Sequence, residues 1–149
     1  MYERILVPLD GSRRAEAIMP HLKTLAHCFG AKVIILQVVE PAYIPSDPAS
    51  YLPELESELN EHRKREAENY LHSWKQRLGS QEIEAEVKVE MGPVIETIIK
   101  VSQDENVDLI AMASHGRSDF SRVIYGSVAN GVLQKIDRPI LLIRSLEKD

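Results

Sequence analysis

The sequence predicts an α/β fold: a three-layer α/β/α sandwich around a five-stranded, mostly parallel sheet. Short runs rich in Val, Ile and Leu recur along the chain, as expected for strands covered on both faces. Segments with helical spacing of apolar residues separate these runs, and such alternation favours a parallel sheet with right-handed crossovers. The five predicted strands are Arg4–Leu9, Ala31–Val39, Ile83–Glu90, Val107–Ala113 and Pro139–Ile143.

A tight turn joins the first strand to the first helix. The turn is Asp10-Gly11-Ser12, and its serine is a good N-cap for a helix that ends at Gly30. Pro20 lies inside the helical pattern, so we expect a kink there, unless the helix restarts with this proline in its first turn. Cys28 falls among apolar residues, and we expect a buried thiol without chemistry.

A proline-rich loop, Glu40–Pro53, follows the second strand and leads into a long helix that ends near Gly79. The stretch Asn60–Glu66 of this helix is almost wholly polar, and its mixed charges at Glu61–Glu66 are interpreted as a solvated face with i,i+4 ion pairs, with a binding patch as the alternative. The third strand, Ile83–Glu90, alternates apolar and charged residues, which is typical of an edge strand with one wet face. The remaining helices are predicted at Val94–Ser102 and Val128–Ile136.

Composition excludes several classes of protein. The 149 residues predict one domain, 1–149, and the net charge of −5 argues against nucleic-acid binding, which needs a basic face. One cysteine cannot form an intramolecular disulfide framework. No signal peptide or membrane-spanning apolar run is visible, so we expect a cytoplasmic protein with no membrane partner.

Three segments are predicted to meet at one cleft. In open parallel sheets, ligands bind beyond the carboxyl ends of the strands, where the strand order reverses. The turn at Asp10, the start of the loop at Glu40 and the segment Ala113–Gly116 all follow predicted strands. We therefore expect them to line a common ligand site.

The segment between the fourth strand and the last helix has the components of a phosphate site. Gly116 can adopt a positive φ, and Gly126-Ser127 opens a helix whose free amides favour an anion. Arg117 and Arg122 add guanidinium groups on the same loop. Glycines that serve only the turn are the alternative. No Walker A or Rossmann glycine motif follows any strand, which argues against P-loop NTPases and dinucleotide dehydrogenases.

Four stretches carry a resemblance to a known family: Ile5–Ser12, Val107–Gly116, Tyr125–Ala129 and Arg138–Leu141. With them the chain resembles the universal stress protein family from Tyr2 to Arg144. The resemblance implies the adenine nucleotide alpha hydrolase-like, or Rossmann-like, version of the predicted fold.

The ATP-binding branch of that family has a glycine, two residues, a second glycine, nine residues, and then Gly-Ser or Gly-Thr. Gly116 and Gly126-Ser127 stand at this spacing, and Ala113 replaces the first glycine. Its methyl group could crowd a backbone that must approach the nucleotide closely.

The resemblance implies an ATP site, with Mg²⁺ held mainly through the phosphates. Asp10 would hold the ribose or base, and Pro8 and Val39 would wall the adenine. The residues that would donate to the phosphates are Gly116, Gly126, Ser127 and Val128. A structural role in the turn is the alternative for Asp10, and His115 lacks a predicted acidic partner for general-base chemistry. The expected nucleotide-binding residues are Pro8, Leu9, Asp10, Val39, Met112, Ala113, Ser114, His115, Gly116, Arg117, Arg122, Gly126, Ser127 and Val128.

Three functions stay open on the sequence. The first is an ATP-dependent stress-response or signalling module with little or no catalysis and an unknown protein partner. The second is a slow ATP hydrolase or phosphotransferase, for which Asp119 and His115 are the nearby groups to test. The third is a nucleotide-free homodimer in which Ala113 marks lost binding. The resemblance also implies a homodimer through the last strand, Pro139–Ile143.

Overall fold

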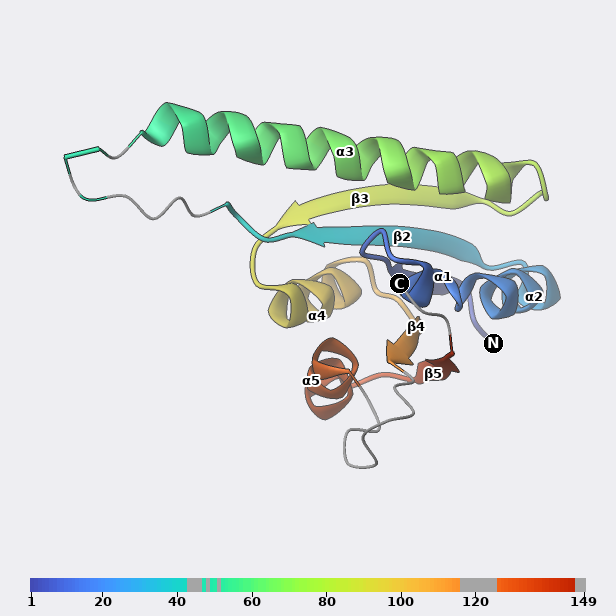
Figure 1. The fold of residues 1–149 in the computed structure, drawn as a ribbon. Helices are drawn as coiled ribbons and strands as arrows, with labels where there is room; N and C mark the ends of the chain where they lie inside the picture. The colour runs from blue at the N-terminus through green and yellow to red at the C-terminus, as the bar shows by residue number, and fades with distance from the viewer. Residues whose placement is uncertain (43–46, 48, 51, 116–125, 147–149) are drawn as a thin grey trace.

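The computed structural model contains one five-stranded sheet in the order β3-β2-β1-β4-β5 (Figure 1). It describes residues 1–42, 47, 49–50, 52–115 and 126–146. Each neighbouring pair of strands is parallel, so the predicted sheet is confirmed. The order turns back at β1, which has β2 on one side and β4 on the other. The strands are β1 (Arg4–Pro8), β2 (Lys32–Val39), β3 (Ala85–Met91), β4 (Leu109–His115) and β5 (Ile140–Ser145).

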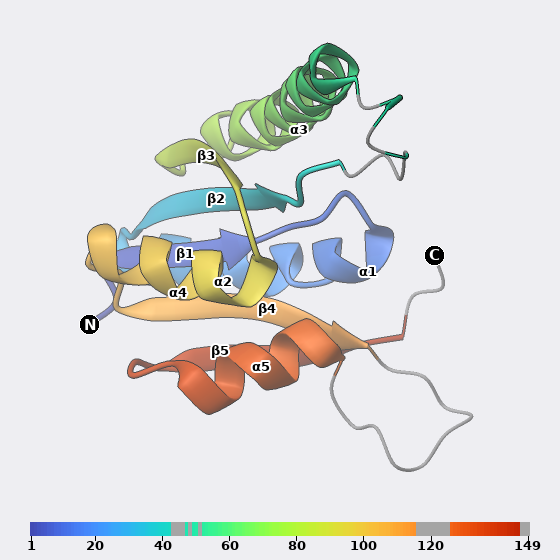
Figure 2. The ribbon, with the colours of Figure 1, turned by 90° about the vertical axis from the view of Figure 1, so that its left-hand side faces the viewer.

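Helices cover both faces of the sheet and complete three layers (Figure 2). The helices α1, α2 and α3 pack on one face, and α4 and α5 pack on the other. This arrangement confirms the predicted α/β/α sandwich. The helices are α1 (Arg13–Glu16), α2 (Met19–Phe29), α3 (Pro53–Gly79), α4 (Val94–Asp104) and α5 (Ser127–Lys135).

The central strand explains why its sequence is continuously apolar. Ile5 and Val7 point into the core beneath α2 and α3, whereas Leu6 points into the core beneath α4 and α5. All three side chains are fully buried, because helices cover both faces of β1. β3 at the edge is only partly buried, as its alternating pattern predicts.

The first predicted helix is two helices, so the expected kink at Pro20 is replaced by a break. α1 ends at Glu16 and α2 begins at Met19, with Pro20 in its first turn. Proline has no N–H and clashes with the preceding turn of a helix. It therefore fits best in the first turn, where backbone N–H groups have no partner within the helix. The alternative prediction, a helix that restarts with Pro20 in its first turn, is therefore confirmed. Gly30 ends α2 with φ 61°, as expected for a C-terminal glycine.

The expectation of a buried Cys28 is wrong, because its side chain is exposed. The buried face of α2 is formed by Met19, Leu22 and Ala26. Cys28 lies two residues beyond Ala26, which turns it by about 200° around the helix axis and away from this face.

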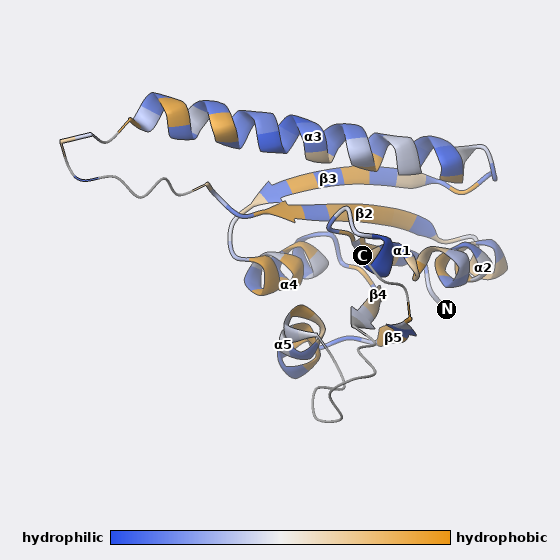
Figure 3. Ribbon diagram, viewed as in Figure 1, coloured by the Kyte–Doolittle hydropathy of each residue, from blue (hydrophilic) through white to orange (hydrophobic). Residues whose placement is uncertain are grey.

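α3 packs on the sheet with only its second half. Its buried residues are Ala67, Leu71, Trp74 and Leu78, and none lies before them in the helix. The first half extends past the strand ends and is largely hydrophilic (Figures 1 and 3).

The polar stretch that we interpreted as a solvated face also has a structural role. The Ala42 N–H donates to Asn60 Oδ1 at 2.7 Å, and Arg63 Nη1 donates to the Glu40 carbonyl at 3.2 Å. These bonds hold the first half of α3 beside the end of β2.

Candidate functional site

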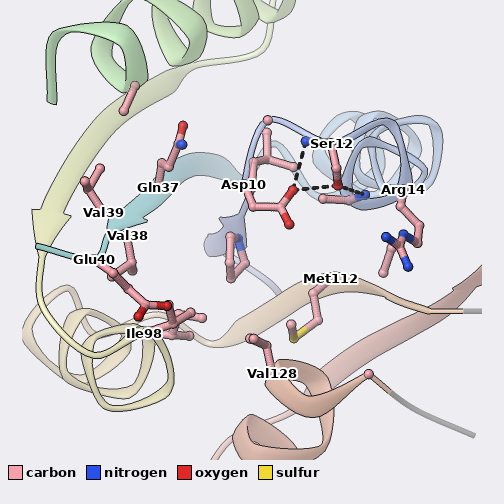
Figure 4. A pocket seen from close by; sticks show the side chains of 18 of the residues that line it. Asp10, Ser12, Arg14, Gln37, Val38, Val39, Glu40, Ile98, Met112 and Val128 are labelled. Carbon is pink, nitrogen blue, oxygen red and sulfur yellow. Dashed lines mark hydrogen bonds between the residues drawn. The ribbon is translucent and has the colours of Figure 1, made fainter. Parts of the chain in front are cut away.

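A cavity of about 620 Å³ lies at the carboxyl ends of β1, β2 and β4 (Figure 4). Its position beside β1 is where the strand order turns back, the usual ligand position in open α/β sheets. Its volume is within the range of small-molecule sites. The cavity is lined by the turn after β1, the end of β2, the face of α3, and the junction of β4 with α5.

Asp10 organises the turn after β1 and also lines the cavity. Its Oδ1 accepts from the Ser12 N–H at 2.9 Å and from the Ser12 hydroxyl at 2.6 Å. The Ser12 hydroxyl in turn accepts from the Ala15 N–H at 3.1 Å and caps α1. Gly11 between them has φ 86°, a conformation that glycine adopts without strain. The turn fixes the carboxylate at the cavity wall.

One side of the cavity is an apolar wall, which we define as Val38, Ile98, Met112 and Val128. Figure 4 shows Ile98, Met112 and Val128 gathered on the α4 and α5 side of the strand ends. Met112 and Ile98 are buried, and Val38 and Val128 pack against the same core. A flat apolar part of a ligand would pack well against such a wall.

The N-terminus of α5 opens at the cavity through Gly126, its N-cap residue. No side chain among the described residues caps this end, so the first amides of the helix keep their donor capacity. Those amides and the helix dipole favour an anion. Gly126 has φ −57°, which any residue can adopt, so the backbone conformation does not require a glycine here.

The other side of the cavity is a polar lobe, which we define as Asp10, Gln37, Arg63, Glu66 and Tyr70. Figure 4 shows Gln37 and Asp10 on the opposite side of the strand ends from Ile98 and Val128. Burial of the phenol, with a smaller contribution from the Glu16 carboxylate, raises the pKa of Tyr70 to about 12. Tyr70 is therefore neutral at physiological pH and keeps its proton as a donor.

Apart from Asp10, the residues of the polar lobe are not among those predicted from the sequence. The available signals were weak: Gln37 is the one polar residue between Val33 and Val39 in an otherwise apolar strand, and Arg63, Glu66 and Tyr70 recur at helical spacing on α3. Which face of α3 meets the cavity depends on how the helix crosses the sheet, and the local sequence does not encode that.

Most predicted site residues lie at the cavity, although their roles in binding stay predictions. Ser127 is exposed at the first position of α5, and the backbone of His115 ends β4. Gly116, Arg117, Arg122 and Asp119 lie outside the described residues. The predicted residues that line the cavity are Pro8, Leu9, Asp10, Val39, Met112, Ala113, Ser114, Gly126 and Val128.

The described residues offer neither a metal site nor a membrane span. No group of three or more His, Cys, Asp or Glu side chains there could hold a metal ion. No helix in that part of the chain is long and apolar enough to cross a membrane.

The comparison with protein families decides the identity of the fold. A family model described as the universal stress protein family matches residues 1–144. The chain belongs to the universal stress protein family. Universal stress protein MJ0577 of Methanocaldococcus jannaschii is 31% identical over 155 aligned positions, which cover 97% of this chain and 96% of that protein. Its solved structure matches with a TM-score of 0.82 at 30% identity and covers 99% of each chain.

Two other universal stress protein structures extend the comparison. UspA from Lactobacillus plantarum has a TM-score of 0.80 at 25% identity, with 96% of this chain and 98% of that chain covered. A universal stress protein from Archaeoglobus fulgidus, solved in complex with dAMP, has a TM-score of 0.62 at 19% identity and covers 95% and 98% of the two chains. The second likeness shows the fold alone.

Proposed function

We propose that this universal stress protein binds ATP in the cavity and acts as a nucleotide-dependent stress-response or signalling module, with little or no catalysis. The observation that carries the proposal is the cavity itself. It combines an apolar wall for a base, a carboxylate at Asp10 and the uncapped N-terminus of α5. Mg²⁺ would be held mainly by the phosphates and water.

The dAMP complex of the Archaeoglobus fulgidus universal stress protein supports an adenine nucleotide as the ligand class. The choice of ATP rests on the spacing of Gly116 and Gly126-Ser127. In this proposal, ATP orders a surface that a protein partner or a second subunit reads.

Binding without rapid turnover is favoured over an enzyme. Among the described residues at the cavity, the acidic side chains come from the turn after β1, the end of β2 and α3. The N-terminus of α5, which no described side chain caps, lies at the junction with β4. A hydrolase needs a residue that orients the attacking water beside the terminal phosphate. Asp119 and His115 remain the groups to test for such a role.

The first experiment asks whether the purified protein carries a nucleotide. Protein prepared without added nucleotide is acid-denatured, and the supernatant is analysed by chromatography. We expect an adenine nucleotide, because retention through purification needs only a Kd of about 1 μM or tighter. If none is released, the protein is titrated calorimetrically with ATP, ADP, AMP and GTP in the presence of Mg²⁺.

The Ala113→Gly variant tests whether the ATP-binding geometry of the family applies here. The Ala113 methyl packs against the core beneath α2 and α3 while the residue lines the cavity. We expect the variant to bind ATP more tightly, by a few-fold, and to lose about 0.5–1 kcal/mol of stability because glycine weakens a strand. Failure of both proteins to bind any adenine nucleotide at millimolar concentration would leave the nucleotide-free homodimer.

A further inference from the structure

The polar lobe contains two polar groups for which the described residues supply no hydrogen bond of normal geometry. Gln37 lies on the same face of β2 as Val33 and Ile35, which pack beneath α2 and α3, because strand side chains alternate. Tyr70 reaches the same space from α3 and packs against the same core. Gln37 Oε1 and the Tyr70 hydroxyl are both closed off from water, and neither makes a hydrogen bond of normal geometry to the described residues. The side chains of Trp74 and Glu16 approach the Tyr70 hydroxyl without completing such a bond.

Other buried hydroxyls in this protein do have partners. The Ser102 hydroxyl donates to the Ile99 carbonyl at 2.6 Å, and the Ser114 hydroxyl donates to the Ile143 carbonyl at 3.3 Å. An unpaired buried polar atom lowers stability, so such atoms in a native protein need an explanation. Here both unpaired groups belong to residues that line one cavity, which indicates that a ligand supplies the missing hydrogen bonds.

The chemistry of the cavity walls indicates which part of a nucleotide reaches these groups. This step rests on the proposed function. A base fits the apolar wall, and phosphates fit the N-terminus of α5. The part that remains is the ribose, whose hydroxyls need donors and acceptors. Asp10, between β1 and α1, begins the polar surface that continues to Gln37 and Tyr70.

We propose that Gln37 and Tyr70 bind the ribose hydroxyls and make the protein select ribonucleotides over deoxyribonucleotides. The Gln37 oxygen accepts from a sugar hydroxyl after a rotation about its terminal torsion, which is soft. The neutral Tyr70 hydroxyl donates to or accepts from the neighbouring one. A deoxynucleotide would leave a buried group unpaired, and such a site rejects a ligand that lacks the hydroxyl.

The experiment is a calorimetric comparison of ATP, 2′-deoxy-ATP and 3′-deoxy-ATP with Mg²⁺, on the parent chain and on the variants Tyr70→Phe and Gln37→Met. We expect the parent to bind ATP about fivefold more tightly than at least one deoxy analogue. Each variant should lose affinity for ATP by a similar factor and keep its affinity for the analogue that lacks the hydroxyl it contacts. The discrimination between the two nucleotides should therefore disappear.

Thermal unfolding separates this role from a structural one. The Tyr70 hydroxyl makes no hydrogen bond of normal geometry to the described residues, so Tyr70→Phe should unfold close to the parent's temperature. Tyr2→Phe is the matched control, because Tyr2 packs edge-on against Phe29 with ring centroids 5.2 Å apart and does not line the cavity. This control should keep the parent's discrimination.

The possible failures are distinguishable. If the parent binds none of the three nucleotides, the proposed function and this inference both fail. If the parent binds ATP and both deoxy analogues equally, the inference is overturned and the proposed function stands. The inference is also overturned, with the proposed function intact, if Tyr70→Phe and Gln37→Met weaken ATP and the analogues by the same factor.

Discussion

At the scale of single residues, the same side chain can hold the fold and face the ligand. Asp10 uses Oδ1 to fix the turn that follows β1 and still lines the cavity. The structural interpretation of this residue and the functional one are therefore compatible. A substitution of Asp10 would disturb both, which makes it a poor test of binding.

Gly126 gives a cleaner test at this scale. Its φ of −57° and ψ of 160° are open to other residues, so Gly126→Val should fold. The branched side chain would stand at the N-terminus of α5, where close approach of an anion to the amides is needed. We expect at least about a tenfold loss of ATP affinity by calorimetry.

The control for this variant is Gly79→Val at the end of α3, where an added side chain meets open space. It should bind ATP as the parent does. Unchanged ATP affinity in Gly126→Val would mean that the phosphates lie elsewhere.

At the scale of elements, the sequence predicts the strands and helices well and their breaks less well. Apolar runs place four of the strands, and the alternation of apolar and charged residues places β3 at the sheet edge. Both patterns are local and need no tertiary information. Pro20 allowed two local structures, and only the packing of α2 selects between them. Likewise, Arg63 and Glu66 read as surface residues until the path of α3 brings them to the cavity.

The contact between α4 and α5 leads to a second prediction. A Cβ added at Gly131 on α5 would overlap with Ile95 Cδ1 on α4, so alanine fits only if the isoleucine side chain moves. In an Ile95→Ala background this obstacle is gone, and Gly131→Ala should stabilise the protein by about 1 kcal/mol through helix propensity. In the parent background the gain should be smaller or reversed.

Denaturant unfolding of the two single variants and the double variant measures this difference. We expect a coupling free energy of at least about 0.5 kcal/mol between the two positions. Additive effects would show that the two helices adjust without cost and that Gly131 is not required for their packing.

At the scale of the whole molecule, the two edges of the sheet differ. β3 carries charged residues that form ion pairs, including Lys88 with Glu105 at 2.7 Å and Glu86 with Lys32 at 2.8 Å. β5 is an apolar edge, in which Ile140, Leu141, Leu142 and Ile143 are all only partly buried. Natural sheets protect such an edge by charge or by cover, and a second copy of the chain would provide cover.

We therefore predict a homodimer through β5 in solution, measured as the mass of two chains by light scattering at micromolar concentration. Leu142→Glu should shift this mass toward one chain, because a carboxylate in a newly buried interface lacks a partner. Leu142 also packs against the core beneath α4 and α5, so circular dichroism must show that the variant is folded.

Leu133→Glu, at a leucine on α5 that is 41% exposed, is the matched control and should keep the parent's mass. A parent chain with the mass of one molecule would show that β5 tolerates solvent on its own. A folded Leu142→Glu variant with the mass of two chains would place the dimer contact on another face.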